Sequence, residues 1–431
     1  MTALDRTRSD PLLLAAAPLA VGVGLWLFLR VGGRMSATEL VALALAPPAV
    51  LVLARLPRGR SLLLLALLWL LGLTFATLAN GGEPMLVARN VANVVVLVAT
   101  VALLVAVLRV PAVREGWSRD VLIAGFGVGE LVGLVLTPPE ATELGLWKFG
   151  AGQALTVCVF VAAQHLRVDR TRLVLPLIAL GLCGLHLALG ARSLALLTLV
   201  LAVAGAVVPT TPRPGSGRRL LLVVVLGFTA IAAYALQRAY SSLAVRGLLG
   251  LTEQMKIGFQ DGDFGVLVGG RKDFVFLVSA VWRNPITGWG PGAVVPSDVK
   301  SAAVMWLQGH GYPVRGYDWI TFVMPDSLYL HSTLLGAWVT AGVLAVPFVL
   351  LCVGICAKGL VSALRRRSFA EAYVVLAALW HLFFSPLGDS SRGHIAFAVA
   401  LGLVALAAGQ PKHRAHGRRS RAIADRATGR R

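Results

Sequence analysis

Two arginines and a histidine in this chain, Arg192, Arg271 and His331, have the types and positions to bind an anion and move a proton. Arg192 lies in the segment Gly190-Ala191-Arg192-Ser193, where it interrupts an otherwise continuous apolar stretch. A permanent charge between apolar segments is costly unless it is paired, so its position indicates an anionic partner. The alternative is a structural arginine that reaches water from a helix end.

Arg271 begins a segment that predicts a helix followed by a stiff turn. The segment opens with Gly269-Gly270-Arg271-Lys272 and ends in Pro285-Ile286-Thr287-Gly288-Trp289-Gly290. Such a Pro/Gly-dense turn lets the backbone come close to a ligand. The alternative for Arg271 is a solvated loop arginine. Four further residues of this segment are candidates for substrate binding: Trp282, Arg283, Gly288 and Gly290.

His331 stands at the end of a polar stretch, directly before a new apolar segment. Histidine changes charge near neutral pH, so a histidine at the mouth of a span and within reach of two arginines suits a general base. A histidine that only makes structural hydrogen bonds is the alternative. Two more residues are candidates for substrate binding: Tyr329 in the same stretch, and Arg392 at the outer end of the last apolar segment.

The composition places these residues in a membrane protein. The 431 residues are 57% hydrophobic and 14% charged, and the mean hydropathy is +0.78, well outside the range of soluble domains. Apolar runs of spanning length recur along the chain. They predict an all-α polytopic fold of about twelve transmembrane helices, near residues 11–29, 40–54, 61–80, 90–108, 121–137, 149–165, 173–190, 194–209, 220–237, 332–357, 369–387 and 393–409.

The basic residues orient these predicted spans. Lys and Arg gather in every second connection and in the tail, whereas the alternate short connections hold few. The positive-inside rule then places both termini in the cytoplasm and the protein in the cytoplasmic (inner) membrane. The net charge of +20 follows from this topology, and nucleic acid is not an expected partner because no soluble domain presents a basic face.

One connection, residues 238–331, is long, rich in Trp and Tyr, and placed outside by this topology. Long loops commonly carry function, and this one is too apolar for a disordered linker, so we expect short helices packed on the membrane face. It divides the chain into residues 1–237 with nine spans, the loop 238–331, residues 332–409 with three spans, and a basic cytoplasmic tail, 410–431.

Other polar groups predict structure more than chemistry. The four cysteines lie in apolar runs and predict packing, and Asp261-Gly262-Asp263 is a turn signal more than a site for a divalent ion. No metal or other cofactor is expected. Hydrogen bonding between helices is expected for five ionisable residues inside spans: Glu39, Glu130, His186, Glu371 and His381.

The order of these motifs resembles the O-antigen ligase and O-antigen polymerase family of bacterial envelope glycosyltransferases. The counterparts are Arg192 opening a span, Arg271 with Trp282 and the turn 285–290, and His331-Ser332-Thr333-Leu334-Leu335 followed by Gly342. The resemblance covers about residues 190–350 together with the helix layout. The chain departs from the family at three positions where Asn, an acidic residue and Gly are usual: Ser332, Thr340 and Ala345.

The resemblance implies an enzyme that transfers a glycan from a polyprenyl-diphosphate carrier to an acceptor hydroxyl, in the biosynthesis of a surface polysaccharide. Arg192 and Arg271 would bind the diphosphate without metal, and His331 would take the acceptor's proton in an inverting displacement. The implied partners are the lipid-linked glycan donor, a glycan, lipid or cell-wall acceptor, and membrane lipid. Ligase and polymerase differ in the acceptor only, and the donor-site residues do not separate them.

A membrane transporter or a lipid flippase is the main alternative from another class. Such proteins are expected to show broken helices near the membrane midplane and internal repeats. The sequence has Pro47-Pro48 in one predicted span but no matching break elsewhere, and the long loop has no role in this interpretation. A structural scaffold is a further alternative.

Overall fold

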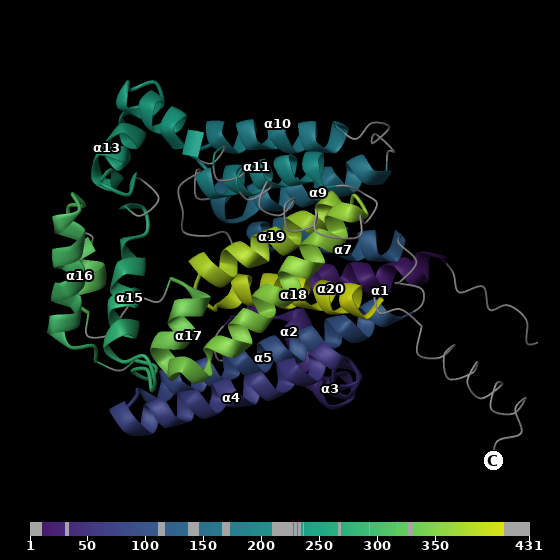
Figure 1. The fold of residues 1–431 in the computed structure, drawn as a ribbon. Helices are drawn as coiled ribbons and strands as arrows, with labels where there is room; N and C mark the ends of the chain where they lie inside the picture. The colour runs from purple at the N-terminus through teal and green to yellow at the C-terminus, as the bar shows by residue number, and fades with distance from the viewer. Residues whose placement is uncertain are drawn as a thin grey trace, which may run out of the picture.

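The computed structural model of the chain is almost entirely α-helical, as predicted (Figure 1). It describes residues 11–30, 34–110, 117–136, 146–165, 173–208, 227, 231, 234–235, 237–265, 269–292, 294–316, 318–325 and 331–408. The candidate Tyr329 and the basic tail 410–431 lie outside these residues, as does most of the span predicted near 220–237.

The elements follow one another in this order: α1 (Pro11–Gly24), β1 (Phe28–Arg30), β2 (Arg34–Ser36), α2 (Ala37–Ala44), α3 (Ala46–Ala54), α4 (Pro57–Asn80), α5 (Pro84–Arg109), α7 (Trp117–Leu136), η1 (Trp147–Ala151), α9 (Gly152–His165), α10 (Val174–Ala188), α11 (Arg192–Val207), α13 (Leu251–Gln260), α15 (Lys272–Arg283), α16 (Ser297–Gly309), η2 (Trp319–Val323), α17 (Thr333–Ala341), η3 (Gly342–Leu344), α18 (Val346–Arg365), α19 (Phe369–Phe384) and α20 (Asp389–Ala408).

Four helices in the described part of the chain are long and apolar enough to cross a membrane: α4, α5, α18 and residues Ser390–Ala408 of α20. The helices α2 and α3 qualify together as a fifth span that is bent by 80°. Apolar helices also lie at other predicted spans, among them α10, α11 and α19, but they are shorter. The described fold is therefore that of a membrane-embedded helical protein.

The helix α20 lies at the centre of the bundle, where it packs against α5, α18 and α19. Its side chains from Ile395 to Leu401 are fully buried. Lipid is as apolar as these side chains, so close packing and interhelical polar contacts hold such a bundle together.

Close packing of small residues is clearest between α1 and α7. Gly125, Gly129 and Gly133 recur every fourth residue along α7, so they share one face. A Cβ atom at Gly125 or Gly129 would come within 2.7 or 2.6 Å of the α1 backbone, and one at Gly133 within 2.7 Å of the Trp26 carbonyl, just after α1. The glycines thus allow the two backbones to touch, as in helix pairs of membrane proteins.

Two predicted spans are broken. The span near 40–54 bends between α2 and α3, where Pro47 and Pro48 begin the second helix and cannot continue the hydrogen bonds of the first. The span near 332–357 breaks at Gly342, whose φ of +66° suits glycine. The sequence showed the first break through its prolines but gave no warning of the second.

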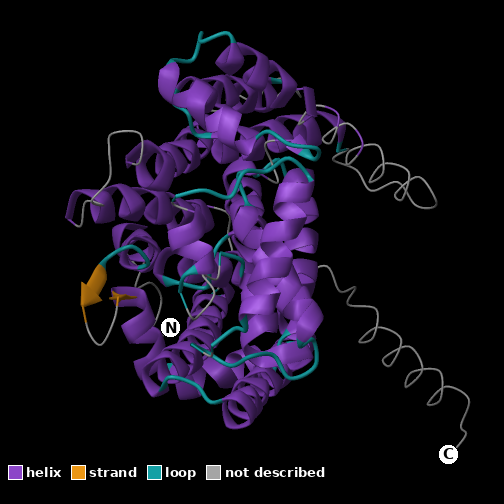
Figure 2. Cartoon of the chain, turned by 90° about the vertical axis from the view of Figure 1, so that its left-hand side faces the viewer, coloured by secondary structure: helices purple, strands orange, loops and turns teal. Residues whose placement is uncertain are grey.

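After α1 the chain forms two short strands that pair with each other, which the sequence did not predict. β1 and β2 pair antiparallel with Phe28 opposite Ser36, and the strands stand at the side of the bundle (Figure 2). Ser36 also caps α2 through a capping box with Glu39. The paired strands therefore fix where α2 begins.

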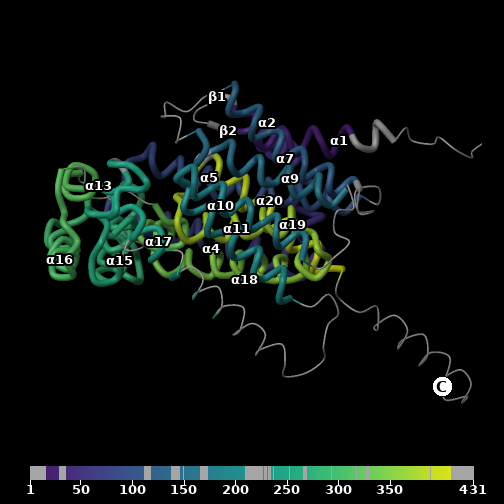
Figure 3. Tube along the Cα trace, turned by 90° about the horizontal axis from the view of Figure 1, so that it is seen from above, coloured from purple at the N-terminus to yellow at the C-terminus, as the bar shows by residue number. Residues whose placement is uncertain are grey.

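The described part of residues 238–331, which the sequence predicts as one long loop, contains short helices. α13, α15 and α16 stand together at one end of the bundle (Figures 1 and 3). The helix α15 packs between α16 and α17, where Leu277, Ala280, Val299 and Val339 form a small apolar core. The loop is thus anchored to the bundle through α17.

Candidate functional site

The start of α15 brings Arg271 and His331 together through a shared aspartate. Arg271 is the N-cap residue of α15, and Asp273 lies in the first turn, where the helix dipole favours a negative charge. The Nδ1 atom of His331 lies 3.5 Å from Oδ2 of Asp273, which is 8% exposed. A buried carboxylate beside one ring nitrogen orients a histidine.

The Arg271 guanidinium lies over two aromatic rings of α19. Its Cζ atom is 5.9 Å from the ring centre of Trp380 and 5.8 Å from that of Phe384. Burial lowers the pKa of Arg271 and Asp273 raises it again, while an arginine stays charged in either case. Within the described residues the guanidinium makes no hydrogen bond or ion pair to an acid. The stacked rings hold it in place and leave its N–H donors for other groups.

Arg192 begins α11 and faces the loop helix α13. Its Nη1 donates to Oε1 of Gln260 at 3.2 Å, and its Nη2 lies 3.9 Å from Oε2 of Glu253. Its Cζ lies 5.2 Å from the ring centre of Tyr240. Arg192 is therefore held at the junction between the bundle and the long loop.

The Glu253 carboxylate also accepts hydrogen bonds from two other side chains. The Tyr240 hydroxyl and the Lys256 ammonium each donate to it at 2.6 Å. Burial alone would raise the pKa of Glu253, but the hydrogen bonds from Lys256 and Tyr240 outweigh it and hold the pKa below its usual value. The single acid is thus shared among several donors, and Arg192 is the most distant of its cations.

Lys148 is within electrostatic range of both arginines. It lies in η1 at the entry of α9, and its side chain is exposed at the surface. Desolvation by the surrounding protein lowers the pKa of Lys148, and the charges of Arg271, Arg192 and Lys256 lower it further. Each of these three cations therefore acts on Lys148, although the four residues come from four separate segments of the chain.

We call Lys148, Arg192, Lys256 and Arg271 the outer cation cluster, after the side on which the predicted topology puts them. Within the described residues, Glu253 and Asp273 are the acids that act on Arg192, Lys256 and Arg271, so these three cations outnumber their acids. Such an excess is stabilised by a ligand that carries more than one negative charge, and guanidinium forks suit phosphate oxygens. With His331 joined to it through Asp273, the cluster can bind a phosphate-bearing ligand beside a proton acceptor.

The glycines of the turn 285–290 are packed against protein backbone. Gly288 has a φ of +70°, and a Cβ atom there would come within 2.5 Å of the Gly342 nitrogen. The Trp289 nitrogen donates to the Val339 carbonyl, and the Val343 nitrogen donates to the Ile286 carbonyl. The turn therefore packs against the break between α17 and α18 and forms hydrogen bonds to residues on both sides of it.

Gly290 has the same kind of environment. Its φ is +84°, and the carbonyl oxygens of Ala76 and Gly81 at the end of α4 lie 3.3 and 3.4 Å from the place of its Cβ. The sequence suggested that the backbone of this turn comes close to a ligand. In the structure, the Gly290 backbone comes close to the end of α4.

Two predicted substrate-binding residues lie away from the outer cation cluster. Trp282, in the last turn of α15, is 87% exposed. Arg283 is also exposed and forms an ion pair of 3.6 Å with Asp298 at the start of α16. The cluster lies at the opposite end of α15, so any contact of Trp282 or Arg283 with a substrate would involve a part that is remote from the phosphate groups.

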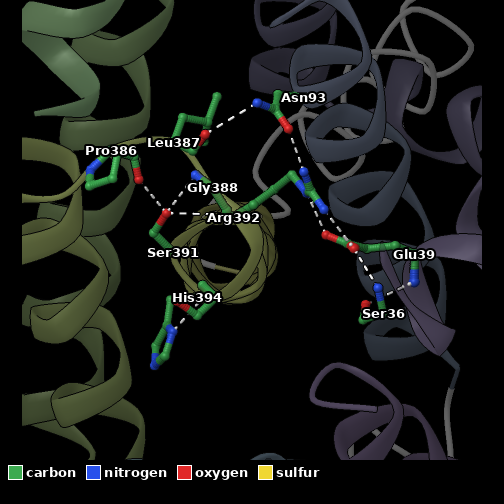
Figure 4. Close-up of polar contacts among 10 residues, drawn as sticks. Ser36, Glu39, Asn93, Pro386, Leu387, Gly388, Ser391, Arg392 and His394 are labelled. Atoms are coloured by element: carbon green, nitrogen blue, oxygen red, sulfur yellow. Dashed lines mark hydrogen bonds and ion pairs between the residues drawn. The ribbon is translucent and has the colours of Figure 1, made fainter. Parts of the chain in front are cut away.

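Arg392 lies in a third place, inside the bundle (Figure 4). Its Nε and Nη2 donate to the two carboxylate oxygens of Glu39 at 2.6 and 2.9 Å, and its Nη1 donates to Asn93. The two charged side chains are 4% and 1% exposed. Arg392 on α20 thus contacts Glu39 on α2 and Asn93 on α5, and these contacts stabilise the packing of the three helices.

Three of the other ionisable residues predicted inside spans also join helices. Glu130 does not follow that expectation, because its Oε2 atom is buried and has no hydrogen-bond partner within the described residues. His186 on α10 accepts from Trp147 and contacts the Thr156 hydroxyl on α9 at 2.9 Å. Glu371 on α19 receives Arg119 of α7 and Arg366. His381 contacts Ser385 at 2.9 Å and its ring lies 4.7 Å from that of His394.

The pair Asp261 and Asp263 lies where α13 ends. Asp261 is the C-cap residue, and the Asp263 nitrogen donates to the His310 carbonyl across the loop. The intervening Gly262 faces the ring of Tyr312, which donates to the Gly265 carbonyl. This arrangement has the features of the turn that the sequence indicated.

The sequence interpretation missed four residues of the site: Lys148, Glu253, Lys256 and Asp273. Lys148 stands where a polar connection meets an apolar segment, Asp273 is two residues after Arg271, and Glu253 and Lys256 have the i, i+3 spacing of a helical charge pair. None of these signals names a partner in another segment, because those contacts join residues that are far apart in the chain. No protein-family model matches the chain, and no curated protein sequence matches it.

Proposed function

We propose that the chain is a membrane glycosyltransferase that moves a glycan from a polyprenyl-diphosphate carrier to an acceptor hydroxyl. The outer cation cluster, joined to His331 through Asp273, is the observation that supports this proposal. A diphosphate leaving group gains negative charge as its bond to the sugar breaks, and fixed cations stabilise that charge most.

In the proposed reaction the acceptor hydroxyl attacks the anomeric carbon of the donor sugar. The new C–O bond forms as the bond to the diphosphate oxygen breaks, and the anomeric configuration inverts. With its Nδ1 directed at Asp273, His331 would accept the hydroxyl proton on Nε2. Arg192, Arg271 and Lys148 would hold the diphosphate, and the loop would position the acceptor.

The proposal includes the finer topology: about twelve spans, both termini in the cytoplasm and the site on the extracytoplasmic face. The lipid-linked donor would reach the site from the outer leaflet. Ligase and polymerase activities share this donor chemistry, and the acceptor would be a glycan, a lipid or a cell-wall polymer.

A reconstituted transfer assay tests the proposal. Purified protein in vesicles receives a polyprenyl-diphosphate oligosaccharide and candidate acceptors, and product is measured by mass spectrometry. Arg271→Ala, Arg192→Ala and His331→Ala are each expected to lower turnover by about 100-fold or more. Arg246→Ala, an exposed arginine of the same loop, is the matched control. Wild-type turnover in all three variants, or a product with retained configuration, contradicts the proposed site.

A transporter or flippase is the second candidate, and the two broken helices favour it. The 80° bend between α2 and α3 and the break at Gly342 provide the pair of interruptions that transport folds use. A fluorescent lipid-linked glycan in vesicles without acceptor separates the candidates. Movement between leaflets that survives His331→Ala, together with no transfer product, supports transport.

A further inference from the structure

A groove at the surface of the bundle lies along α18, and none of its lining residues belongs to the outer cation cluster. Its volume is about 430 Å³, and it is formed between α18, the start of α4 and the end of α20. The two long helices α4 and α18 are in contact, and Figure 1 shows them side by side. The groove is therefore a product of the bundle itself and involves no loop.

The walls of this groove are apolar. They are formed by Leu350, Leu351, Gly354, Ile355 and Leu406, and Leu350 is 53% exposed although it is a large hydrophobic residue. The lining residues on α18 extend from Pro347 to Lys358, which is roughly 16 Å at 1.5 Å per residue. That length is about half the hydrocarbon thickness of a bilayer, so the groove matches the acyl chains of one leaflet.

Two cations close one end of the groove. Arg58 stands in the first turn of α4 and Lys358 near the end of α18. Both are exposed, and in the part of the chain that the structure describes neither forms an ion pair with an acid. The basic end also carries Arg55 and Arg60, so the local charge is positive. Such an end attracts a phosphate at the level of lipid headgroups.

We propose that this groove binds one anionic phospholipid of the cytoplasmic leaflet. Its phosphate lies between Arg58 and Lys358, and an acyl chain lies against Leu350, Leu351 and Ile355. The combination of an apolar wall of leaflet length with two uncompensated cations at its end fits a lipid and does not fit a free phosphate, which has no use for the wall. The site depends on membrane insertion and is independent of the proposed glycan transfer.

Native mass spectrometry of the full chain released from detergent micelles tests the site. The protein is titrated with phosphatidylglycerol or with phosphatidylcholine of the same acyl chains, and retained lipid is counted. The wild type is expected to retain phosphatidylglycerol about tenfold better. The double variant Arg58→Gln with Lys358→Gln loses this preference, whereas Arg109→Gln, an exposed cation at the end of α5, keeps it.

A second variant tests the apolar wall. Leu350→Trp places a bulky ring in the groove from an exposed position, so the core stays intact, and it is expected to lower phosphatidylglycerol retention several-fold. Soluble glycerol phosphate should not displace the bound lipid. The proposal is overturned by equal retention of the two lipids in the wild type, by full selectivity in the double variant, by unchanged retention in Leu350→Trp, or by displacement with glycerol phosphate alone.

Discussion

Arg392 and Arg271 show two opposite ways of holding a guanidinium in this protein. Arg392 lies in the bundle with both carboxylate oxygens of Glu39 as acceptors, so its charge is neutralised by the fold. Arg271 rests on the rings of Trp380 and Phe384 and acts electrostatically on Lys148. The first arginine is satisfied before any ligand arrives, whereas the second is positioned but still needs an anion.

The two arginines indicate how a structural charge differs from a charge available for binding in a membrane protein. A buried charge without a partner is costly. Arg392, whose charge serves helix packing, is therefore paired with Glu39. At Arg271, whose charge we propose to serve binding, the fold supplies aromatic surfaces and a nearby acid, and the rings support the guanidinium without occupying its donors. A polar residue in an apolar segment is therefore informative only once its partner is known.

Breaking the neutralised pair should give the largest effect. Glu39→Ala leaves Arg392 buried without its carboxylate, which costs about 3–5 kcal/mol of stability. Chemical unfolding in detergent measures this loss. Arg283→Ala, which removes the exposed pair with Asp298, is the comparison and should cost no more than about 1 kcal/mol. Equal unfolding curves for Glu39→Ala and wild type would show that the pair carries no stability.

The unsatisfied arginine should give a binding effect with little loss of stability. Arg271→Ala is expected to weaken pyrophosphate binding by about 10- to 100-fold, because each charge-assisted hydrogen bond contributes roughly 1.5–3 kcal/mol. Lys148→Ala should weaken it less, because an ammonium is a point charge without a fork. Calorimetry with pyrophosphate alone measures both variants. Unchanged affinity in Arg271→Ala would remove the outer cation cluster as an anion site.

The sequence predicts the membrane class and most helix positions because apolar runs and helical hydrogen bonding are local properties. It also placed Arg271 at a helix start and His331 before an apolar segment, and the structure has Arg271 at the N-cap of α15 and His331 just before the short helix α17. These statements depend on spacing alone. They need no knowledge of which helices are neighbours.

The partners of these residues could not be predicted in the same way. His331 meets Asp273, which is 58 residues away, and the charge of Arg271 acts on Lys148, which lies in a distant segment of the chain. Gly288 looked like a ligand-binding glycine, but its close neighbour is Gly342. Short glycine motifs indicate a close approach of the backbone, and only the fold decides whether protein or ligand is approached.

Glu253, the acid near Arg192, should give a smaller effect, which is a dependence of local stability on pH. The folded-state pKa of Glu253 is lowered from the ordinary value of 4.5, so Glu253 stabilises the fold above that value and the contribution is lost as the pH falls through the folded pKa. Hydrogen exchange of α13 should show protection that declines in acid in the wild type. Glu253→Gln should have lower protection at pH 7 and no such decline, and the same decline in both proteins would contradict this account.

The smallest effect is expected at Trp282, which tests whether the site extends beyond the phosphates. Its side chain is 87% exposed, so Trp282→Ala should change stability by no more than about 0.5 kcal/mol. It should also leave pyrophosphate affinity unchanged, since the outer cation cluster lies at the other end of α15. If a sugar ring stacks on the indole, the variant raises the KM for the glycan several-fold while Trp282→Phe retains most of the affinity. An unchanged KM in Trp282→Ala would confine substrate contact to the end of α15 that carries Arg271.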